Sequence, residues 1–359
     1  MKWMMLVGLA AAISCTRPSE ERALADLTVG TAAFGGTRVE VVDGLATIRA
    51  LADERLELWA QAPVLDLALT VDPAAVGDWT IVVRNTLGDA HLVVDGLTYT
   101  REPGDRPTVA TFRIGLGIGT HQLRIAPPDA DRIEPFKVAA MADIQTALPD
   151  VHQVFARISA VPEARFVIAM GDITDRGEIW EYDLFEQQLA TLAVPFYTTI
   201  GNHELWGPDE RFLSRFGRMN FQFQFKGAAF SFVDSGDAGI DPIVEEWLED
   251  WLARGRDSAH VFLTHMPPVD PVGTRYGSFR STRDGRRLLS RLVEGDVDLT
   301  LYGHIHTYID FENAGIPAYV SGGGGADPML FDGINRHFLV VDIDPTTGTI
   351  GDVVVHHVD

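Results

Sequence analysis

Cysteine is nearly absent from this sequence of 359 residues, because Cys15 is the only one. A lone cysteine cannot form a disulfide within the chain, so a fold held together by disulfides is excluded. Basic residues are also few: 29 Lys and Arg stand against 51 Asp and Glu, which gives a formal net charge of −22. Such a charge repels polyanions, so we expect no nucleic acid as a partner and no basic face for membrane binding.

Repeats and low-complexity tracts are missing as well, apart from the four glycines at 322–325. Hydrophobic residues make up 46% of the chain and charged residues 22%. This is the balance of an ordinary globular protein that can bury a sizeable core. The length exceeds that of one typical domain and suits two.

The chain begins with an apolar run that is too short to span a membrane. Trp3 to Ile13 follow Lys2 without a charge, whereas a spanning helix needs ~20 apolar residues. A basic start and an apolar stretch of this length are typical of a secretory signal. We therefore assign residues 1–15 to a signal peptide.

Cys15 ends this segment in a context that is similar to a bacterial lipobox, in which the cysteine is lipidated and becomes the mature N-terminus. The alternative is plain cleavage after residues 10–12, which would leave a stray thiol. We favour the lipobox because an exported chain with one cysteine can form no internal disulfide. The sequence thus predicts an exported lipoprotein of the cell envelope with a lipid anchor in the membrane, and residues 16–23 would form a short polar tether.

Residues 24–134 carry an all-β pattern. Short runs rich in Val, Ile and Leu recur, and turn formers such as Asp43-Gly44 and Asp95-Gly96 bound them. We expect strands at residues 38–42, 64–69, 80–83, 91–94, 111–114 and 121–125. Strands at this spacing predict a β-sandwich of immunoglobulin or fibronectin type, in which we find no catalytic cluster.

From residue 135 to residue 359, apolar runs alternate with helical patterns. Buried strands are expected at residues 136–141, 166–170, 196–200, 261–264 and 299–302. Between them lie apolar residues at helical spacing, and Asp241-Pro242 has the composition of a helix start. This alternation predicts an α/β domain.

Each of the five strands leads into residue types that bind metal ions. In chain order these are Asp143 and Gln145, Gly171-Asp172 through Asp175-Arg176-Gly177, Gly201-Asn202-His203-Glu204, His265, and Gly303-His304-Ile305-His306. Ligands collect at the carboxyl ends of strands in α/β sheets. Carboxylate, amide oxygen and imidazole together suit Mn, Fe, Zn or Co rather than calcium.

This series resembles the calcineurin-like metallophosphoesterase superfamily over nearly all of residues 135–359. The pattern of that family is D-x-H, G-D-x-x-D-R-G, G-N-H-[D/E], a lone His, and G-H-x-H. The resemblance implies a four-layer α/β/β/α sandwich, in which two mixed sheets pack together with helices outside. It also implies an enzyme with two divalent or trivalent metal ions.

The resemblance assigns seven metal ligands residue by residue. The first metal would be held by Asp143, Gln145, Asp172 and His306. The second would be held by Asp172, Asn202, His265 and His304, so that Asp172 bridges the two.

The residue types at two positions of this sequence differ from those of related families. Gln145 stands where most members have His, and its amide oxygen is a neutral and weaker ligand. We interpret Gln145 as a ligand, and the alternative is that water takes its place. Purple acid phosphatases share the layout of a β-sandwich followed by a catalytic domain, but they place a metal-binding Tyr where this chain has Asp175, so we expect no tyrosinate–iron site.

The predicted chemistry is the hydrolysis of a phosphate ester. Two cations ~3.5–4 Å apart can lower the pKa of a bridging water and clamp the phosphoryl oxygens, so the nucleophile would be a hydroxide that bridges the metals. His203 would act as proton donor and Asp175 would orient it. By resemblance, Arg176 would contact the phosphate.

Two further groups could select the substrate. Arg275, Arg280 and Arg283 follow His265 and could bind phosphate, although a solvated loop is an equal alternative. Trp206 and Phe212 could line a pocket, but we expect both to pack in the core.

The expected partner is a phosphorylated substrate, either a small molecule or protein-bound, and no partner protein is evident. Two other functions stay open. One is a non-catalytic surface lipoprotein that binds carbohydrate or protein through the β-sandwich. The other is a nuclease of the same superfamily, against which the net charge of −22 counts.

Overall fold

The computed structural model describes residues 17–52, 54–273, 277–329 and 334–359. The predicted signal segment with Cys15 therefore lies outside the described residues, and so does Arg275. Within the described ranges, no helix is long and apolar enough to cross a membrane.

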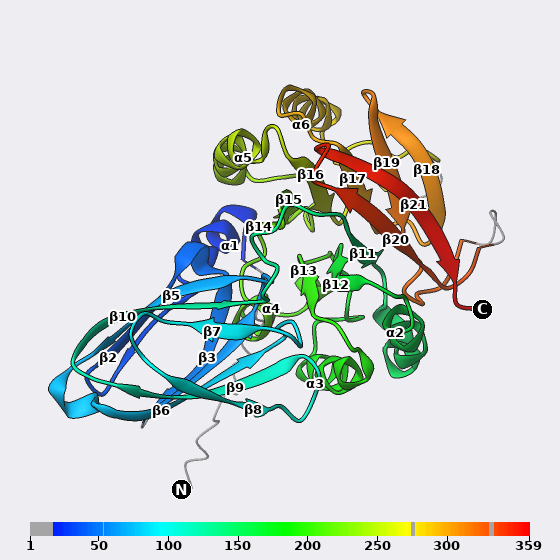
Figure 1. Cartoon of the computed structure of the whole chain (residues 1–359). Helices are drawn as coiled ribbons and strands as arrows, with labels where there is room; N and C mark the ends of the chain where they lie inside the picture. Colours follow the sequence, from blue (N-terminus) through cyan, green and yellow to red (C-terminus); the bar gives the residue numbers. More distant parts are fainter. Residues whose placement is uncertain (1–16, 53, 274–276, 330–333) are drawn as a thin grey trace, which may run out of the picture.

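The N-terminal part is a sandwich of two five-stranded sheets (Figure 1), with strand orders β1-β2-β5-β10-β7 and β3-β4-β6-β9-β8. The strands are β1 (Thr31–Phe34), β2 (Thr37–Val41), β3 (Ala46–Ala52), β4 (Arg55–Ala60), β5 (Leu65–Val71), β6 (Gly77–Arg84), β7 (His91–Val93), β8 (Tyr99–Pro103), β9 (Val109–Leu116) and β10 (Gly119–Ala126). All pair antiparallel except β4 with β6, which run parallel. The predicted all-β fold of this region is confirmed.

Alternation along the strands builds the core of the sandwich. In β5, Leu65, Leu67, Leu69 and Val71 are buried, and the residues between them face outward. Successive side chains of a strand point to opposite faces, so one face of each sheet supplies the apolar layer.

The C-terminal part contains two mixed sheets. One has the order β13-β12-β11-β20-β21 and the other β14-β15-β16-β17-β19-β18. The first sheet is built from β11 (Phe136–Met141), β12 (Ala164–Ala169), β13 (Phe196–Thr198), β20 (His337–Asp344) and β21 (Thr349–His357). The second is built from β14 (Phe221–Phe225), β15 (Ala228–Val233), β16 (Ala259–Thr264), β17 (Leu299–Tyr302), β18 (Tyr308–Asn313) and β19 (Ile316–Ser321).

Helices cover the outer faces of both sheets (Figure 1). Helices α2 (His152–Ser159) and α3 (Ile179–Gln188) share a hydrophobic core with the first sheet. Helices α5 (Pro242–Gly255) and α6 (Thr282–Glu294) share another with the second sheet. The start of α5 is the predicted one, because the Asp241 side chain accepts a hydrogen bond from Ile243 N at 3.0 Å. The four-layer α/β/β/α arrangement is therefore confirmed.

Aromatic rings fill the space between the two sheets. Phe136 of the first sheet packs edge-on against Phe225 of the second, with ring centroids 5.3 Å apart. Phe166 packs in the same way against Phe230, at 5.5 Å. These contacts fix how the two sheets meet, and hence how their strand ends line up at the site.

The predicted tether, residues 16–23, differs from the structure. Ser19–Asp26 form helix α1, which lies beside α5 (Figure 1). Arg22 is 1% exposed and pairs with Asp234 and Asp237, each at 2.8 Å. The polar composition of this segment suggested a tether, but Arg22 forms ion pairs with residues more than 200 positions away. A local sequence pattern cannot reveal such distant partners.

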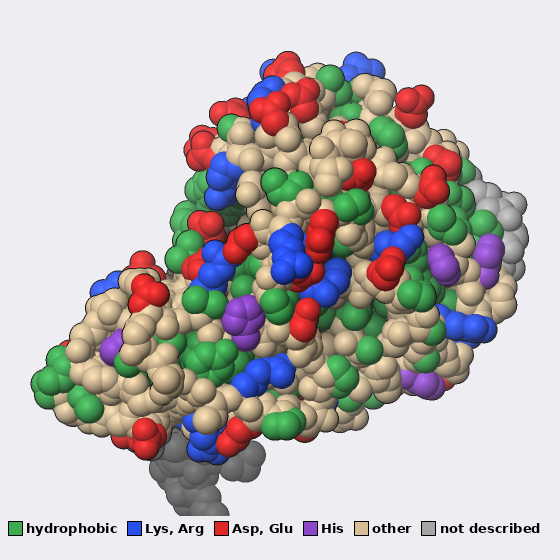
Figure 2. All heavy atoms as spheres, viewed as in Figure 1, with side chains coloured by type: hydrophobic (Ala, Val, Ile, Leu, Met, Phe, Trp, Pro, Cys, Tyr) green, Lys and Arg blue, Asp and Glu red, His purple; other side chains and the backbone are tan. Residues whose placement is uncertain are grey.

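Charges of both signs are interspersed on the face that Figure 2 shows. Among the described residues, Arg165 pairs with Asp89 and Asp129 at 3.0 and 3.1 Å, and Arg49 and Arg215 both pair with Glu186.

Candidate active site

The five polar motifs converge where the two sheets lie side by side. Strands β11, β12 and β13 deliver three of them, and β16 and β17 deliver the other two. Main-chain hydrogen bonds join the loops: Ile144 N donates to Asp172 O at 2.8 Å, and Gly303 N donates to His265 O at 2.9 Å. The predicted convergence at strand ends therefore has a rigid backbone frame.

Four of the predicted ligands have left-handed backbone. The φ angles are 63° at Asp143, 45° at Gln145, 54° at Asp172 and 67° at His304. This conformation costs an L-residue of order 1 kcal/mol or more, and such strain gathers at functional sites. Here the left-handed backbone bends the chain sharply just after the strands, at the residues whose side chains form the site.

The first predicted ligand group is assembled. His306 Nε2 lies 3.5 Å from Asp143 Oδ1. Gln145 Nε2 donates to Asp172 Oδ2 at 2.7 Å and lies 3.3 Å from His306 Nε2. The amide nitrogen of Gln145 thus faces the site, and a rotation of the amide by about 180° would place the oxygen there instead.

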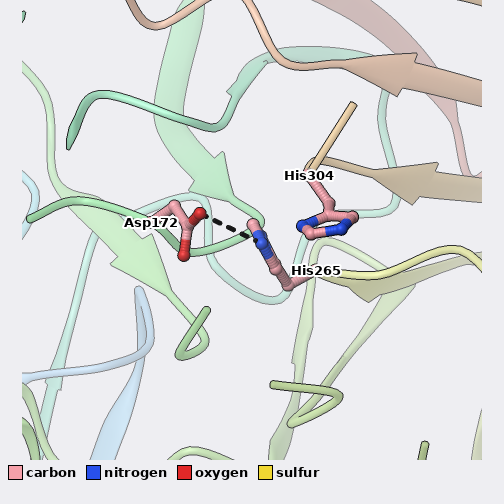
Figure 3. A group of neighbouring side chains, drawn as sticks. All are labelled: Asp172, His265 and His304. Atoms are coloured by element: carbon pink, nitrogen blue, oxygen red, sulfur yellow. Dashed lines mark ion pairs between the residues drawn. The ribbon is translucent and has the colours of Figure 1, made fainter. Parts of the chain in front are cut away.

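The second group gathers Asp172 with His265 and His304 (Figure 3). One donor atom each of Asp172, His265 and His304 falls within 4.8 Å of the others. His265 Nε2 lies 3.2 Å from Asp172 Oδ2 and 2.9 Å from Asn202 Oδ1. All seven predicted ligand residues are therefore brought together, in two groups that share the Asp172 carboxylate.

Backbone carbonyls orient the imidazoles. The Nδ1 of His265 donates to Met170 O at 2.6 Å, and the Nδ1 of His306 donates to Asp327 O at 2.8 Å. A carbonyl can only accept, so Nδ1 carries a proton in both residues and Nε2 is the nitrogen that points into the site. Metal-ligating histidines are commonly held in this way.

The electrostatics of the site favour a cation. Asp143 Oδ1 is buried and has no hydrogen-bond partner among the described residues, which is costly for a carboxylate unless a positive charge is nearby. Burial lowers the pKa of His265, but Asp172 and Asp143 outweigh burial and raise it to about 9. Burial raises the pKa of Asp172, yet His265 and His203 bring it well below its ordinary value. The site therefore demands positive charge, and its carboxylate, amide and imidazole donors fit the predicted metals.

His203 stands at the rim of the site and does not belong to either ligand group. Its Nε2 lies 4.0 Å from Asp172 Oδ2, and its Nδ1 donates to the backbone oxygen of Asp175 at 2.7 Å. The Asp175 carboxylate is more distant, with Oδ1 at 3.5 Å. The contact of Asp175 with His203 is therefore made mainly through its carbonyl rather than its carboxylate. The Arg176 side chain is 67% exposed and close to the Asp175 carboxylate, with Nε 3.4 Å from Oδ2.

Glu204 has a structural role that the sequence analysis missed. This fully buried carboxylate accepts hydrogen bonds from Asp172 N at 3.0 Å, Thr174 N at 2.8 Å, Thr174 Oγ1 at 2.7 Å and Gly201 N at 2.9 Å. It therefore clamps two of the motif loops together. The sequence does contain an indication of this role, because Glu204 is the acidic residue that ends the motif Gly201-Asn202-His203-Glu204.

The expectation for Trp206 was wrong and that for Phe212 was right. Phe212 is fully buried, whereas Trp206 is 62% exposed. The two differ because Glu204–Trp206 form a single 3-10 turn, η5, which points Glu204 inward and Trp206 outward. Phe212 instead lies on helix α4 (Glu210–Phe216), which packs against β3.

The loop after His265 returns to the site. A Cβ at Gly277 would lie 2.8 Å from Ile305 Cγ1 and 3.5 Å from His304 Cδ2. Arg280 and Arg283 follow in exposed positions. Their role in substrate selection stays a prediction.

Comparison with known proteins agrees with this fold. Residues 136–308 match the model of the calcineurin-like phosphoesterase family. This part of the chain belongs to that family, and the predicted superfamily is therefore confirmed.

The proteins that are similar to the chain include a phosphodiesterase and a phosphatase. Over 160 residues, or 40% of this chain, it is 29% identical to a probable glycerophosphodiester phosphodiesterase, GpdQ, of Arcobacter nitrofigilis, and the match spans 58% of that protein's length. The fold is also similar to the purple acid phosphatase PPD1 from yellow lupin seeds, with a TM-score of 0.53 and 15% identity. That match covers 82% of this chain and 72% of the lupin chain, and at this identity it shows the fold alone.

Proposed function

We propose that this protein hydrolyses phosphate esters with two metal ions that share the Asp172 carboxylate. The observation that carries the proposal is that Oδ2 of this one buried carboxylate lies 2.7 Å from Gln145 Nε2, of the first ligand group, and 3.2 Å from His265 Nε2, of the second. A carboxylate shared by two ligand groups suits a site that holds two metal ions close together.

Seven residues would hold the ions. Asp143, Gln145, Asp172 and His306 form one set, and Asp172, Asn202, His265 and His304 form the other. Ions of this kind, when bound, lower the pKa of water and neutralise the oxygens of a phosphoryl group.

His203 would protonate the leaving oxygen. Its Nδ1 proton is engaged by the Asp175 carbonyl at 2.7 Å, so Nε2 is the atom that can take up a proton and deliver it to a substrate. The Asp175 carboxylate, 3.5 Å from Nδ1, stabilises the imidazolium form that the transfer requires. Arg176, exposed at the same rim, can reach a phosphoryl oxygen with its guanidinium group.

Phosphodiesters are the first substrates to test, because the relative from Arcobacter is described as a probable glycerophosphodiester phosphodiesterase. We would compare bis-p-nitrophenyl phosphate, p-nitrophenyl phosphate and a glycerophosphodiester, each with Mn, Fe, Zn or Co. Asp172→Ala, with metal content measured in parallel, is the control. We expect metal-dependent turnover in the wild type, and loss of both turnover and bound metal in the variant. A wild type that binds two ions and hydrolyses none of these esters would contradict the proposal and favour a binding protein.

We further propose that the mature protein is a cell-envelope lipoprotein anchored through Cys15. The support is the short apolar run after Lys2 and the lipobox-like context of the only cysteine. Cys15→Ser should move the protein from the membrane fraction to the soluble fraction, or leave the precursor uncleaved. Unchanged fractionation and processing would favour a plain signal peptide.

A further inference from the structure

Trp206 is a large aromatic side chain that the fold leaves in solvent at the active site. It is 62% exposed, although burial of its apolar rings would stabilise the fold. Its neighbour Glu204 in the same turn is fully buried. An exposed indole beside a candidate proton donor therefore calls for an explanation.

The indole is stacked on the imidazole of His203. The two ring centroids are 5.0 Å apart and the ring planes differ by 15°. The Arg176 guanidinium carbon lies 5.7 Å from the Trp206 ring centroid. Since the His203 side chain is only 13% exposed, the indole extends the buried imidazole outward as a flat apolar surface.

The turn that carries Trp206 is fixed in place. Trp206 N donates to His203 O at 3.2 Å. A Cβ at Gly207 would lie only 2.5 Å from Gly177 O, so the chain segments that carry Trp206 and Arg176 are in direct backbone contact. Arg211 Nη1 adds a hydrogen bond to Gly177 O at 2.8 Å. The indole is therefore presented in a preorganised orientation, which lowers the entropy cost of binding a ligand against it.

We propose that Trp206 is the platform for the leaving group and makes the enzyme prefer esters whose leaving group is a flat aromatic ring. The proposal rests on the proposed function, because it takes His203 as the donor to the leaving oxygen. A group attached to that oxygen must lie within a few ångströms of His203, which is where the indole surface begins. Stacked aromatic pairs contribute to binding beyond the apolar area that they bury.

The test compares two series of phosphate esters with matched leaving-group pKa, one aryl and one fluorinated alkyl. The pKa match removes the effect of proton donation, so that only the shape and the π surface differ. Trp206→Ala should lower kcat/KM for the aryl series by ~3- to 10-fold, mainly through KM, and should change the alkyl series by less than ~2-fold. Trp206→Phe should restore most of the aryl preference, because it keeps a ring.

Trp180 offers a matched control. It is also 62% exposed, but it lies in the first turn of α3. Trp180→Ala should leave the ratio of aryl to alkyl kcat/KM unchanged. An equal shift in both tryptophan variants, or an equal loss for both series in Trp206→Ala, would overturn the proposal. The second outcome would show that Trp206 only positions His203.

Binding of inhibitors separates this proposal from the proposed function. Phenylphosphonate and methylphosphonate cannot be hydrolysed, and their affinity for the metal-loaded full-length protein can be measured by calorimetry. We expect phenylphosphonate to bind more tightly, with an advantage that Trp206→Ala removes. This result in a protein without esterase activity would reject the proposed function, and with it the leaving-group role, and would show only that the Trp206 indole binds an aromatic ring at the site. Esterase activity without any phenyl advantage would support the proposed function and reject the platform.

Discussion

The imidazole of His203 is held by a main-chain oxygen rather than by the carboxylate that sequence patterns suggest. Its Nδ1 lies 2.7 Å from Asp175 O but 3.5 Å from Asp175 Oδ1. A backbone carbonyl cannot be removed by substitution of the side chain. The orientation of His203 is therefore built into the loop, and the Asp175 side chain contributes mainly its charge.

This geometry predicts unequal effects of two substitutions. His203→Ala should lower kcat by ~10²–10⁴-fold and leave the metal content unchanged, with smaller losses for esters whose leaving groups need no protonation. Asp175→Asn should cost less than ~10-fold, because the carbonyl still fixes the ring. Steady-state kinetics over a range of leaving groups checks both. Losses of equal size in the two variants would show that the carboxylate, and not the carbonyl, orients the ring.

Gln145 is the residue at which the site departs from the common family pattern. Its amide lies between Asp172 and His306, at 2.7 and 3.3 Å, where a ligand to the first ion would have to stand. Gln145→His should tighten that site, because imidazole is the better donor to Mn, Fe, Co or Zn. Gln145→Ala should leave activity dependent on added metal.

Metal stoichiometry of the three proteins after dialysis against a chelator checks this prediction. The gain in Gln145→His should fade at low pH, because an imidazole must lose its proton to bind metal whereas an amide need not. If stoichiometry and metal dependence are the same in all three, Gln145 is not a ligand, and the first site rests on Asp143, Asp172 and His306.

The sequence was sufficient to predict which residues meet, but not how each is held. Ligand residue types directly after apolar strands had to converge, because strand ends of α/β sheets share one edge. The left-handed backbone at Asp172 and the carbonyl that holds His265 depend on loops from other strands. The exposure of Trp206 was missed for a similar reason: hydrophobicity predicts burial, whereas the single turn η5 has room to bury only Glu204.

At the scale of elements, Glu204 connects the loop after β12 to the loop after β13. Its Oε1 accepts from Thr174 N and Oγ1, and its Oε2 accepts from Asp172 N and Gly201 N. Gly201 in turn must lack a side chain, because a Cβ there would lie 2.1 Å from Asp172 Oδ1. The carboxylate and the glycine together fix the position of the bridging Asp172.

Glu204→Gln should therefore loosen both loops. The amide has one acceptor oxygen, so its NH₂ group would face two N–H or O–H donors, and each donor left without a partner costs ~1–3 kcal/mol. We expect a lower melting temperature and weaker metal binding, with activity partly restored by excess metal. Glu246→Gln, at an exposed position of α5, is the control and should change neither property. A Glu204→Gln protein with wild-type stability and metal affinity would show that the clamp is not needed.

Four strands of the sandwich were not predicted, and three of them lie at sheet edges. Strand β5 was predicted from its run of Val and Leu, whereas the edge strands β1, β3 and β8 carry weaker apolar patterns. Strand β4 lies inside its sheet, and its buried Leu56, Leu58 and Ala60 did alternate in the sequence. Its omission was therefore an error of interpretation and not a lack of signal.

At the scale of the whole molecule, α1 ties the start of the described chain to the C-terminal part. Arg22 pairs with Asp234 just after β15, and Arg17 binds Asp209 Oδ2 at 2.6 Å, three residues after Trp206. The sandwich adds its own links, because Arg49 of β3 binds Glu186 of α3 at 2.9 Å. Removal of one partner of a buried pair such as Arg22–Asp234 leaves an uncompensated charge. These ion pairs and hydrogen bonds therefore connect the N-terminal and C-terminal parts of the chain.

Asp26, at the end of α1, should make the stability of the protein depend on pH. The carboxylate is fully buried and accepts hydrogen bonds from Met219 N at 2.8 Å and from Asn220 N and Nδ2 at 2.9 Å. Burial outweighs these bonds and raises the pKa of Asp26 from 3.8 to about 7. Between these two values the folded protein keeps a proton that the unfolded chain has released. The contribution of Asp26 to the free energy of unfolding is therefore fully present below about pH 4. As the pH rises further, this contribution falls by up to ~1.4 kcal/mol per pH unit, and it levels off above pH 7.

Urea unfolding of the wild type and of Asp26→Asn, measured from pH 4 to pH 8, checks the sign and the size of this effect. The variant cannot titrate at this position, but its NH₂ group must face the donors of Met219 or Asn220, so it should be the less stable protein at pH 4. The difference in unfolding free energy between the two proteins should then shrink steadily as the pH rises to about 7, because only the wild type loses stability through this group. Glu204, whose pKa burial and the neighbouring Asp172 also raise to about 7, is present in both proteins and cancels in the difference. A difference that stays constant over the whole range would show that Asp26 is ionised throughout, and that its three hydrogen bonds outweigh its burial.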